Sequence, residues 1–191
     1  ALSSAASDVY KRQVLNDNGK LIGYNTDGYG FMQSVRDAGH DITGKNITVM
    51  GVGGASMAIC AQSALDGAAS VHIFARRTSR YWNRTQKFAE NLSAKTGCQV
   101  CLFDNDDHTA LRDSIAQSYL LINATSVGMV PDIDDTIIKD TSLFHPELVV
   151  ADVVYEPQET RLLREAKAAG CQTFNGMYML CLLYTSDAAD D

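Results

Sequence analysis

A glycine-rich turn follows a short apolar run and precedes a helix-like segment. Residues 47–50 are β-branched or apolar, as in a strand that is buried on both faces. Gly51, Gly53 and Gly54 follow this run, and residues 57–61 have the composition of a helix. In such a turn the backbone N–H groups can approach a phosphate, and the positive end of the helix dipole stabilises its charge. The turn therefore predicts a site for the pyrophosphate of a dinucleotide.

The turn departs from the usual dinucleotide pattern at its third glycine. Ser56 occupies that position, and we expect Ala58 to be the small residue that packs the helix against the strand. The alternative is a turn without a ligand, but the repeating strand–helix pattern around the turn favours cofactor binding. The residues of the turn predicted to contact the cofactor are Gly51, Val52, Gly53, Gly54 and Ala55.

A basic segment follows the next predicted strand, residues 71–74, about twenty residues past the glycine turn. An NAD site usually has a carboxylate here, which binds the ribose 2′-hydroxyl, whereas an NADP site uses arginine. Residues 75–80 contain three arginines and no acid, and a guanidinium can hold a 2′-phosphate through two hydrogen bonds. We expect Arg76, Arg77 and Thr78 to bind NADP, with NAD as the alternative cofactor and a solvated basic loop as the alternative without a ligand.

Predicted strands and helices alternate along most of the chain. Strands that are separated by helices form right-handed crossovers, which produce a parallel sheet covered on both faces. We therefore predict an α/β fold with a doubly wound, mostly parallel, six-stranded Rossmann-like sheet. The predicted strands are residues 47–50, 71–74, 100–103, 119–122, 148–154 and 171–174, after a short strand at 21–25, and the predicted helices are 27–38, 57–66, 82–94, 108–117 and 159–169.

The two ends of the chain differ in composition from its middle. Residues 1–13 are small and polar without periodicity, and residues 182–191 end in a run of Ser, Asp and Ala. Both resemble segments foreign to the domain, with ordinary termini as the alternative, so both are left out of the fold prediction. We expect a remnant of a second α/β substrate domain and its linking helix at 14–40, an NAD(P)-binding domain at 41–175, and the start of a return helix at 176–181.

Composition excludes several classes of protein. The formal net charge of -7 argues against a general nucleic-acid binder, and no apolar run reaches the length of a membrane span. Five cysteines, an odd number, fit a reducing cytoplasm better than a disulfide framework. Cys98 and Cys101 form a CxxC pair without a second pair, so no metal site is predicted.

Five motifs of the chain together identify a family resemblance. Their order and spacing resemble those of the shikimate dehydrogenase family, including its quinate/shikimate branch, from roughly Val14 to Leu180. The resemblance implies NADP- or NAD-linked interconversion of 3-dehydroshikimate and shikimate, on the route to chorismate and the aromatic amino acids, by a monomer or homodimer. Quinate is a further candidate substrate. The motifs are residues 23–28 (GYNTDG), 51–55 (GVGGA), 123–129 (NATSVGM), 152–157 (DVVYEP), and Gly176 with Met179 and Leu180.

The resemblance also assigns roles to single residues. Asp27 matches the family's catalytic aspartate, and Thr26 and Tyr155 match substrate-binding positions. An acid–base group is needed because hydride leaves a secondary alcohol only as the O–H proton is removed. The alternative for Asp27 is a helix cap. The further cofactor-contacting positions are Thr125, Ser126, Gly128, Met129, Val153, Gly176 and Met179.

The chain departs from the family pattern in three places. The family pairs its aspartate with an upstream lysine, and neither Lys11 nor Lys20 is assigned that role. Leu183 stands near the family's substrate-binding glutamine, and Ala75 replaces the asparagine of the usual Asn-Arg-Thr. We therefore expect the chain as given to bind NADP without turning over shikimate.

Other functions stay open on sequence alone. One is a different NADP-linked enzyme on this scaffold, such as a methylene-tetrahydrofolate dehydrogenase or a glutamyl-tRNA reductase, against which residues 25–28 argue. Another is a non-catalytic NAD(P)-binding or regulatory module. For the predicted helix at 27–38, we expect Phe31 and Val35 to be exposed, because the strands that would cover them lie upstream of this chain.

Overall fold

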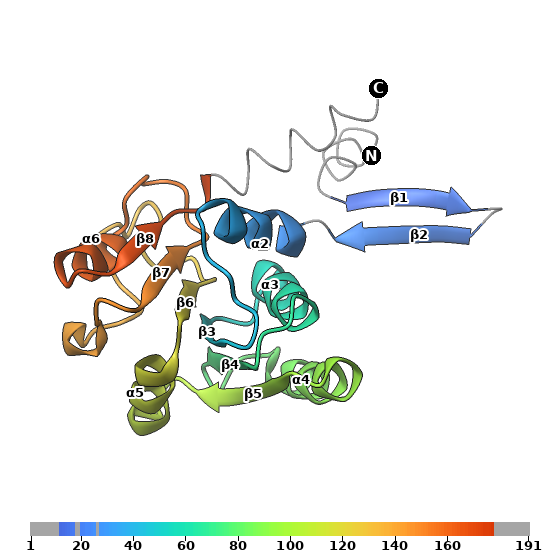
Figure 1. Cartoon of the computed structure of the whole chain (residues 1–191), viewed down its shortest axis with the longest axis horizontal. Helices are drawn as coiled ribbons and strands as arrows, with labels where there is room; N and C mark the ends of the chain where they lie inside the picture. The colour runs from blue at the N-terminus through green and yellow to red at the C-terminus, as the bar shows by residue number, and fades with distance from the viewer. Residues whose placement is uncertain (1–11, 18–19, 26, 178–191) are drawn as a thin grey trace.

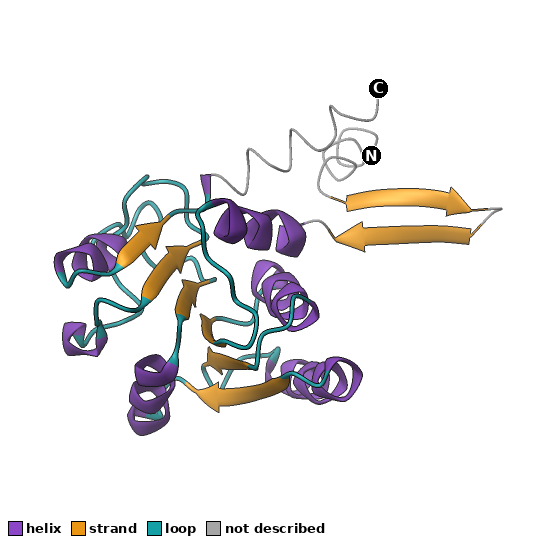
Figure 2. Cartoon of the chain, in the orientation of Figure 1, coloured by secondary structure: helices purple, strands orange, loops and turns teal. Residues whose placement is uncertain are grey.

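The computed structural model describes residues 12–17, 20–25 and 27–177 of the 191-residue chain. Six parallel strands form one sheet with helices on both faces, which confirms the predicted α/β fold (Figure 1 and Figure 2). The strands of this sheet are β3 (Asn46–Met50), β4 (Ser70–Ala75), β5 (Gln99–Asp104), β6 (Leu120–Asn123), β7 (Val149–Asp152) and β8 (Gln172–Phe174). The helices are α2 (Asp27–Asp37), α3 (Gly54–Leu65), α4 (Trp82–Thr96), α5 (His108–Gln117), α6 (Arg161–Ala168) and a 3₁₀ turn, η1 (Thr141–Leu143).

The strand order places a change of direction in the middle of the sheet. The order is β5-β4-β3-β6-β7-β8, so the chain runs outward from β3 to β5 and then returns to the other side of β3 at β6. Helices α2, α3 and α4 lie on one side of the sheet, and α5 and α6 lie on the other (Figure 1). Ligands of doubly wound sheets bind at the carboxyl ends of the strands where the order reverses, which here is between β3 and β6.

The strands are buried on both faces, and alternate side chains enter two different cores. Val49 and Ile73 belong to the core under α2, α3 and α4, whereas their neighbours Met50 and Phe74 belong to the core under α5 and α6. All four side chains are at most 1% exposed. Continuous apolar runs are expected where a parallel sheet is covered on both sides, and this is why the sequence pattern located the strands.

A small network of polar side chains is buried between α5 and the face of the sheet that α5 covers. The Thr48 hydroxyl lies 2.6 Å from that of Ser114 and 2.7 Å from that of Ser118. His72 Nδ1 lies 2.9 Å from the Ser114 hydroxyl, and burial lowers the pKa of the His72 imidazole. Buried hydroxyls need partners, and these side chains satisfy one another across β3, β4 and α5.

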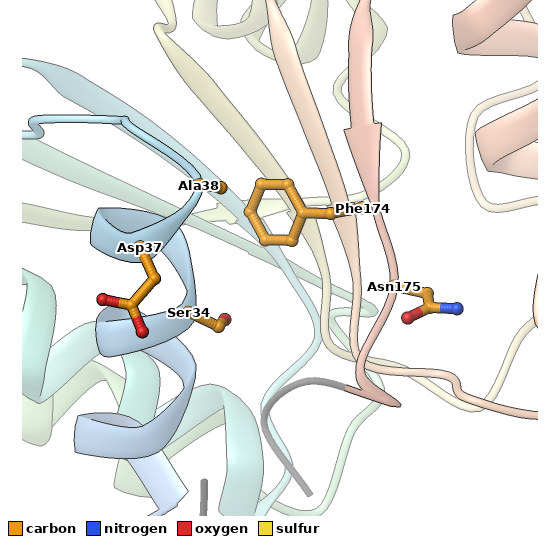
Figure 3. Close-up of a pocket in the computed structure, with 5 residues that line it drawn as sticks. All are labelled: Ser34, Asp37, Ala38, Phe174 and Asn175. Carbon is orange, nitrogen blue, oxygen red and sulfur yellow. The ribbon is translucent and has the colours of Figure 1, made fainter. Parts of the chain in front are cut away.

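Helix α2 is part of the first core. Phe31, Met32 and Val35 are fully buried, so the expectation that Phe31 and Val35 would be exposed is wrong. The covering surface comes from α3 and from the end of β8, where the ring of Phe174 lies 6.1 Å from that of Phe31. Phe174 points toward α2 beside a hollow of about 320 Å³ that Ser34, Asp37, Ala38 and Asn175 also line (Figure 3).

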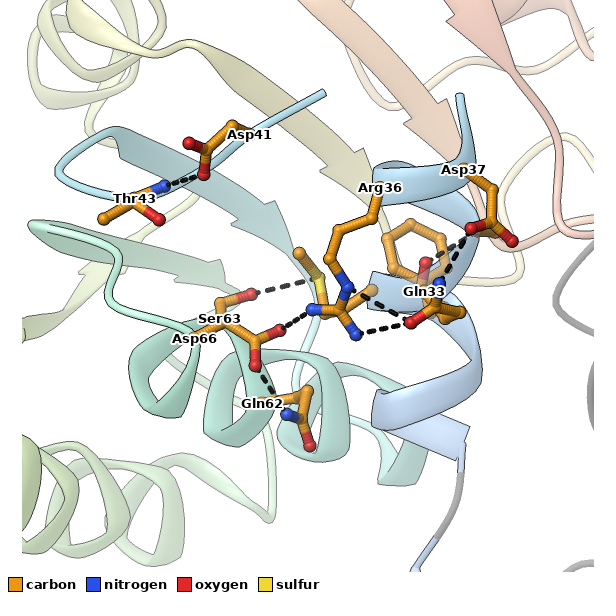
Figure 4. A network of polar contacts seen from close by, with 11 residues as sticks. Gln33, Arg36, Asp37, Asp41, Thr43, Gln62, Ser63 and Asp66 are labelled. Carbon is orange, nitrogen blue, oxygen red and sulfur yellow. Dashed lines mark hydrogen bonds and ion pairs between the residues drawn. The ribbon is translucent and has the colours of Figure 1, made fainter. Parts of the chain in front are cut away.

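Two further contacts fix α2 against α3. At one end, a Cβ on Gly28 would lie 2.2 Å from the carbonyl oxygen of Ala58, so the two backbones approach to a distance that only glycine allows. At the other end, Arg36 Nη1 lies 2.6 Å from Asp66 Oδ2, and Gln33 and Gln62 complete the network (Figure 4). The helix that begins with Asp27 is therefore attached to the dinucleotide-type sheet.

A separate antiparallel hairpin precedes α2. It consists of β1 (Arg12–Asp17) and β2 (Lys20–Asn25), with Arg12 opposite Asn25, and it projects away from the six-stranded sheet (Figure 1). We did not predict β1, which begins inside the segment 1–13 that we had set aside as foreign. The division of the chain into domains stays a prediction.

Most element boundaries agree with the sequence pattern. Helix α5 has the predicted bounds, and Asp107 caps it by accepting a hydrogen bond from the N–H of Ala110. Helix α6 begins two residues later than predicted, because Thr160 caps it by accepting from the N–H of Leu163. None of the helices in the part of the chain that the structure describes is long and apolar enough to cross a membrane.

We expect Gly28→Ala to destabilise the chain by about 1–3 kcal/mol, the usual cost of overpacking a close contact. The added methyl group would meet the Ala58 carbonyl oxygen at 2.2 Å, and this backbone atom cannot turn aside. Urea unfolding followed by circular dichroism measures the change. Gly54→Ala is the matched control, because no other group lies within 4 Å of a Cβ placed there. Equal stability of the two variants would contradict the close packing of α2 on α3.

Candidate functional site

Gly51 brings two strand-end loops into direct contact at the change of strand direction. Its φ is +109°, a conformation that favours glycine, and its N–H donates to the carbonyl oxygen of Phe74 at the end of β4. A Cβ on Gly51 would lie 2.8 Å from the Ala124 carbonyl oxygen and from Cγ2 of Thr125. The turn after β3 and the loop after β6 can meet only because this residue has no side chain.

The first turn of α3 is open toward solvent. The N-cap residue Gly53, which precedes the helix, has no side chain to cap it, and no other group lies within 4 Å of a Cβ placed on Gly53 or Gly54. The first backbone N–H to bond inside this helix is that of Met57, which donates to the Gly53 carbonyl oxygen. The earlier N–H groups are the orphan donors that a helix N-terminus offers to an anion.

Ser56 takes the structural place of the missing third glycine. Its side chain is fully buried, and its hydroxyl donates a 2.6 Å hydrogen bond to the carbonyl oxygen of Gly51, which tightens the turn. Our assignment of Ala58 as the residue that packs the helix on the strand is wrong. Ala58 lines an open groove, and its carbonyl group contacts Gly28 of α2, because this face of α3 is turned away from the sheet.

Asn123 organises the loop after β6. Its amide donates to the carbonyl oxygen of Val127, and its Oδ1 accepts from both the N–H and the hydroxyl of Thr125. The Thr125 hydroxyl oxygen in turn accepts from the N–H of Val127. Gly128 is buried at φ +89°, while Ser126 and Met129 are exposed. The loop thus holds a fixed backbone and directs two side chains outward.

Asp152 is a buried carboxylate that joins three parts of the site. Its Oδ1 accepts from the amide of Asn123 at 3.0 Å and from the N–H of Val154 at 2.9 Å, and its Oδ2 accepts from the hydroxyl of Thr160 at 2.8 Å. Burial raises the pKa of this carboxyl to about 6, although these hydrogen bonds lower it. Asp152 therefore ties the loop after β6 to the end of β7 and to the first turn of α6.

The end of β7 contacts the segment that follows β8. The N–H of Val153 donates to the carbonyl oxygen of Asn123, and its own carbonyl oxygen would lie 2.3 Å from a Cβ on Gly176. Tyr155 is 46% exposed at the same edge, so its hydroxyl is available to a ligand. Thr26 and Met179, also predicted to bind ligands, lie outside the described residues.

The basic loop after β4 holds its arginines in different ways. The guanidinium of Arg77 lies over the ring of Trp82 at 4.8 Å, and that of Arg80 lies over the ring of Tyr81 and donates to its hydroxyl. Arg76 is exposed, and its guanidinium makes no hydrogen bond or ion pair with a described residue. Because Gly51 bonds to Phe74, this loop begins next to the glycine turn.

A groove of about 520 Å³ runs between the first turns of α3 and α4. It is within the usual size range of small-molecule sites. Val52, Gly53 and Gly54 form one side, and Tyr81 and Arg84 lie on the α4 side. The sequence did not indicate Arg84, since an arginine in the first turn of a helix usually faces solvent.

Asp27 is the first residue of α2 and is partly exposed. Its neighbour Gly28 touches Ala58, a residue in the second turn of α3, so the Asp27 carboxylate lies on the part of α2 nearest the N-terminal half of α3. The structure thus attaches the predicted acid–base residue and the predicted phosphate turn to the same pair of helices.

Sequence reasoning gave no role to Asn123 and Asp152, although both lie in motifs that we had singled out. A polar residue at the end of each of two adjacent apolar strands is a usable signal, because the carboxyl ends of parallel strands meet at one edge. Asn123 and Asp152 are indeed aligned partners in the pairing of β6 with β7. Their hydrogen bonds hold the loops at the ends of these strands in place.

We expect Asp152→Asn to change the pH dependence of stability. The folded chain holds the Asp152 proton more tightly than the unfolded chain, so its contribution to the free energy of unfolding falls as pH rises from 3.8 to about 6. The amide variant keeps the acceptor and carries no buried charge, so it should gain stability relative to the parent between about pH 4 and about pH 7. Urea unfolding at both pH values measures this difference.

Asp135→Asn is the control with the opposite sign. A hydrogen bond from Lys139, followed by one from the backbone of Thr136, lowers the pKa of Asp135. Its contribution is therefore present at neutral pH and is lost as pH falls, so this variant should lose stability relative to the parent as pH rises. If Asp152→Asn followed the same direction as Asp135→Asn, the Asp152 carboxyl would not be destabilised by burial.

Comparisons with known proteins agree with this architecture. No protein-family profile matches the chain. The NADP(+) shikimate dehydrogenase of Listeria innocua serovar 6a is 48% identical over 167 residues, which cover 87% of this chain and 57% of that protein. A quinate/shikimate dehydrogenase of Escherichia coli is 40% identical over 87% of this chain and 58% of its own length. The chain therefore spans somewhat more than half the length of the curated relatives it matches.

A solved structure extends the agreement to the fold. The shikimate 5-dehydrogenase of Listeria monocytogenes, crystallised in complex with shikimate and NAD, superposes with a TM-score of 0.85 at 46% identity. The superposition covers 89% of this chain and 58% of that one. The fold of the chain is thus shared with that protein. The chain belongs to the shikimate dehydrogenase family.

Proposed function

We propose that this chain forms the cofactor-binding part of an NADP-dependent dehydrogenase that interconverts 3-dehydroshikimate and shikimate. The observation that carries this proposal is the open first turn of α3 at the change of strand direction, with the helix of Asp27 packed beside it. The Listeria relative is named for NADP and shikimate, which supports the same assignment.

The glycine turn has the chemistry that a dinucleotide requires. Gly53 and Gly54 leave open space above N–H groups that no side chain caps, and the helix dipole adds positive potential there. The groove beside them accommodates the adenosine end, with Tyr81 as an aromatic wall. NADP, when bound, accepts or supplies the hydride. Thr125, Ser126, Met129, Val153 and Gly176 are proposed to line its nicotinamide end.

Asp27 is proposed to hold and transfer the proton of the substrate hydroxyl. A carboxylate in the first turn of a helix is stabilised by the dipole, so it can accept a hydrogen bond from an alcohol in its charged form. Because α2 is fixed on α3, the position of this carboxylate relative to the glycine turn is set by packing. Tyr155 is proposed to orient the substrate from the edge of β7, together with Thr26.

The names of two relatives support NAD as an alternative cofactor and quinate as an additional substrate. The Listeria monocytogenes relative was crystallised with NAD, and the Escherichia coli relative is named for quinate as well as shikimate. Use of NAD, with quinate as an additional substrate, is therefore the alternative to an NADP-dependent shikimate dehydrogenase. A non-catalytic NAD(P)-binding module remains the alternative from another class, and the loss of activity in the Asp27 test below would exclude it.

The proposal extends to where the protein is located, how it assembles and whether the isolated chain is active. Cys60, Cys98, Cys101 and Cys171 are all free thiols, as expected in the cytoplasm, where we place the protein. We propose a monomer or homodimer that binds small molecules only. We also propose that the 191-residue chain alone binds NADP without turnover, because orienting a substrate against the nicotinamide requires contacts from both sides.

Arg76→Ala combined with Arg77→Ala should weaken NADP binding to the 191-residue chain by about tenfold or more, because charge-assisted hydrogen bonds to the 2′-phosphate are lost. NAD has no such phosphate, and its affinity should change little. Isothermal titration calorimetry with each cofactor measures both. Arg80→Ala is the matched control, since that guanidinium is held by Tyr81. Equal weakening of NADP and NAD would refute the assignment of these arginines to the 2′-phosphate.

Asp27→Asn, placed in a full-length protein that contains this chain, should lower kcat for shikimate oxidation by about two to four powers of ten, as expected when a positioned acid–base group is lost. NADP affinity should stay unchanged, because the amide keeps the shape of the carboxylate. Stopped-flow and steady-state absorbance of NADPH report the rate. A variant with a normal kcat would show that Asp27 only begins the helix.

A further inference from the structure

Trp82, the first residue of α4, lies beneath the guanidinium of Arg77 in the basic loop after β4. The central carbon of that guanidinium is 4.8 Å from the centroid of the Trp82 ring. A cation over an aromatic face at this distance is attracted by the electrons of the ring, and tryptophan gives the strongest contact of this kind. The function proposed above gives Trp82 no role.

Two consecutive tight turns bring these two side chains together. The N–H of Ser79 donates to the carbonyl oxygen of Arg76, so Arg77 and Thr78 lie at the tip of the first turn. The N–H of Trp82 donates to the carbonyl oxygen of Ser79, and this second turn leads directly into α4. The backbone therefore folds Arg77 back over the start of the helix.

The ring of Trp82 is a fixed support, because it belongs to the inner face of α4. It is 9% exposed, and Thr85, Ala89 and Leu92, which follow at helical spacing, are buried as well. The helix packs on β5 and α3. A guanidinium that rests on such a ring loses less conformational freedom on binding an anion than one that extends into solvent.

The hydrogen-bond donors of Arg77 stay available to a ligand. Its side chain is exposed, and its guanidinium N–H groups bond no described residue. Residues 75–89 contain five basic residues and no acidic one, so no carboxylate in this stretch competes for these donors. A planar guanidinium can offer two of its N–H groups to one phosphate.

The other two arginines of the loop differ from Arg77. Arg80 lies over the ring of Tyr81 and also donates to its hydroxyl, so part of its donor set is already used. Arg76 is exposed and rests on none of the aromatic rings that the structure describes. Among the three, Arg77 combines a supported position with free donors.

We propose that Trp82 is a positioning residue, which gives the site its preference for NADP by holding Arg77 ready for the 2′-phosphate. This inference rests on the proposed function, because it requires the loop after β4 to receive the phosphorylated ribose. It also divides the work of two arginines, since Arg76 has to be ordered when the phosphate binds and Arg77 is ordered beforehand. The ring acts only through Arg77, so it affects NADP and leaves NAD alone.

Trp82→Leu in the 191-residue chain should weaken NADP binding about two- to fivefold and leave NAD binding unchanged, as expected when one cation–π contact near the surface is lost. Arg77→Ala should weaken NADP binding more than Arg76→Ala does. Isothermal titration calorimetry with each cofactor gives the ratio of the two affinities. Tyr81→Leu is the matched control, because Tyr81 lines the groove proposed for the adenosine of both cofactors, and it should weaken both equally.

A double-mutant cycle separates positioning from a loss of structure. Trp82→Leu added to Arg77→Ala should cause no further change in the ratio of NADP affinity to NAD affinity, because the guanidinium through which the ring acts is already absent. A ring that only stabilised α4 would lower both affinities in either background. Trp82→Phe keeps a weaker aromatic face and should give an intermediate ratio, so it replaces Trp82→Leu if that variant does not fold.

Fluorescence tests the same contact without changing the ring, since Trp82 is the only tryptophan of the chain. 2′,5′-ADP, the half of NADP that carries the 2′-phosphate, should change the tryptophan emission as the phosphate binds the guanidinium above the ring. 5′-AMP lacks that phosphate and should change the emission much less. Arg77→Ala should abolish the difference between the two probes.

Three results would overturn the inference. They are an affinity ratio that Trp82→Leu and Trp82→Phe leave unchanged, additive effects of Trp82→Leu and Arg77→Ala on that ratio, and a difference between the two fluorescence probes that survives Arg77→Ala. In each case the chain still binds NADP, so the proposed function would stand. A parent chain that binds neither cofactor would refute the cofactor site and this inference with it.

Discussion

The contact of Gly51 with the carbonyl group of Ala124 and the methyl group of Thr125 is the constraint on which the site depends. The strand order reverses between β3 and β6. The connections that follow these two neighbouring strands therefore run in opposite directions, and the loops diverge above the strands. Here the missing side chain at Gly51 lets the turn after β3 rest directly on the loop after β6. The open N-terminus of α3 is presented above this junction.

The junction extends sideways through a buried charge. Asn123, next to the contacted residues, is bonded to Asp152 at the end of the neighbouring strand, and Asp152 also holds Thr160, which caps α6. Burying a carboxylate costs free energy, and three donors offset part of that cost here. The loops of the site are thus positioned by one connected network, while the exposed residues Ser126, Met129 and Tyr155 are left outside it.

The sequence predicted the structure correctly where the residues next to one another along the chain determine it. The apolar runs around Val49 and Ile73 located the strands, because a strand covered on both faces has no polar side. Contacts between segments that are far apart along the chain could not be predicted from such local patterns. The fit of Gly28 on Ala58, 30 positions apart along the chain, depends on how two helices cross, and so we wrongly expected Phe31 to be exposed. Strand β1 lacks periodicity and became visible only through its pairing with β2.

The docking of α2 on α3 has a mechanical consequence. Asp27 belongs to the same rigid unit as the glycine turn, through Gly28 at one end of the helix and the Arg36–Asp66 ion pair at the other. Any opening and closing movement that occurs upstream of this helix would therefore leave the separation between the carboxylate and the turn unchanged. If Asp27 acts as we propose, such a movement would bring the substrate to a proton acceptor that is already in place, and the acceptor itself would not travel.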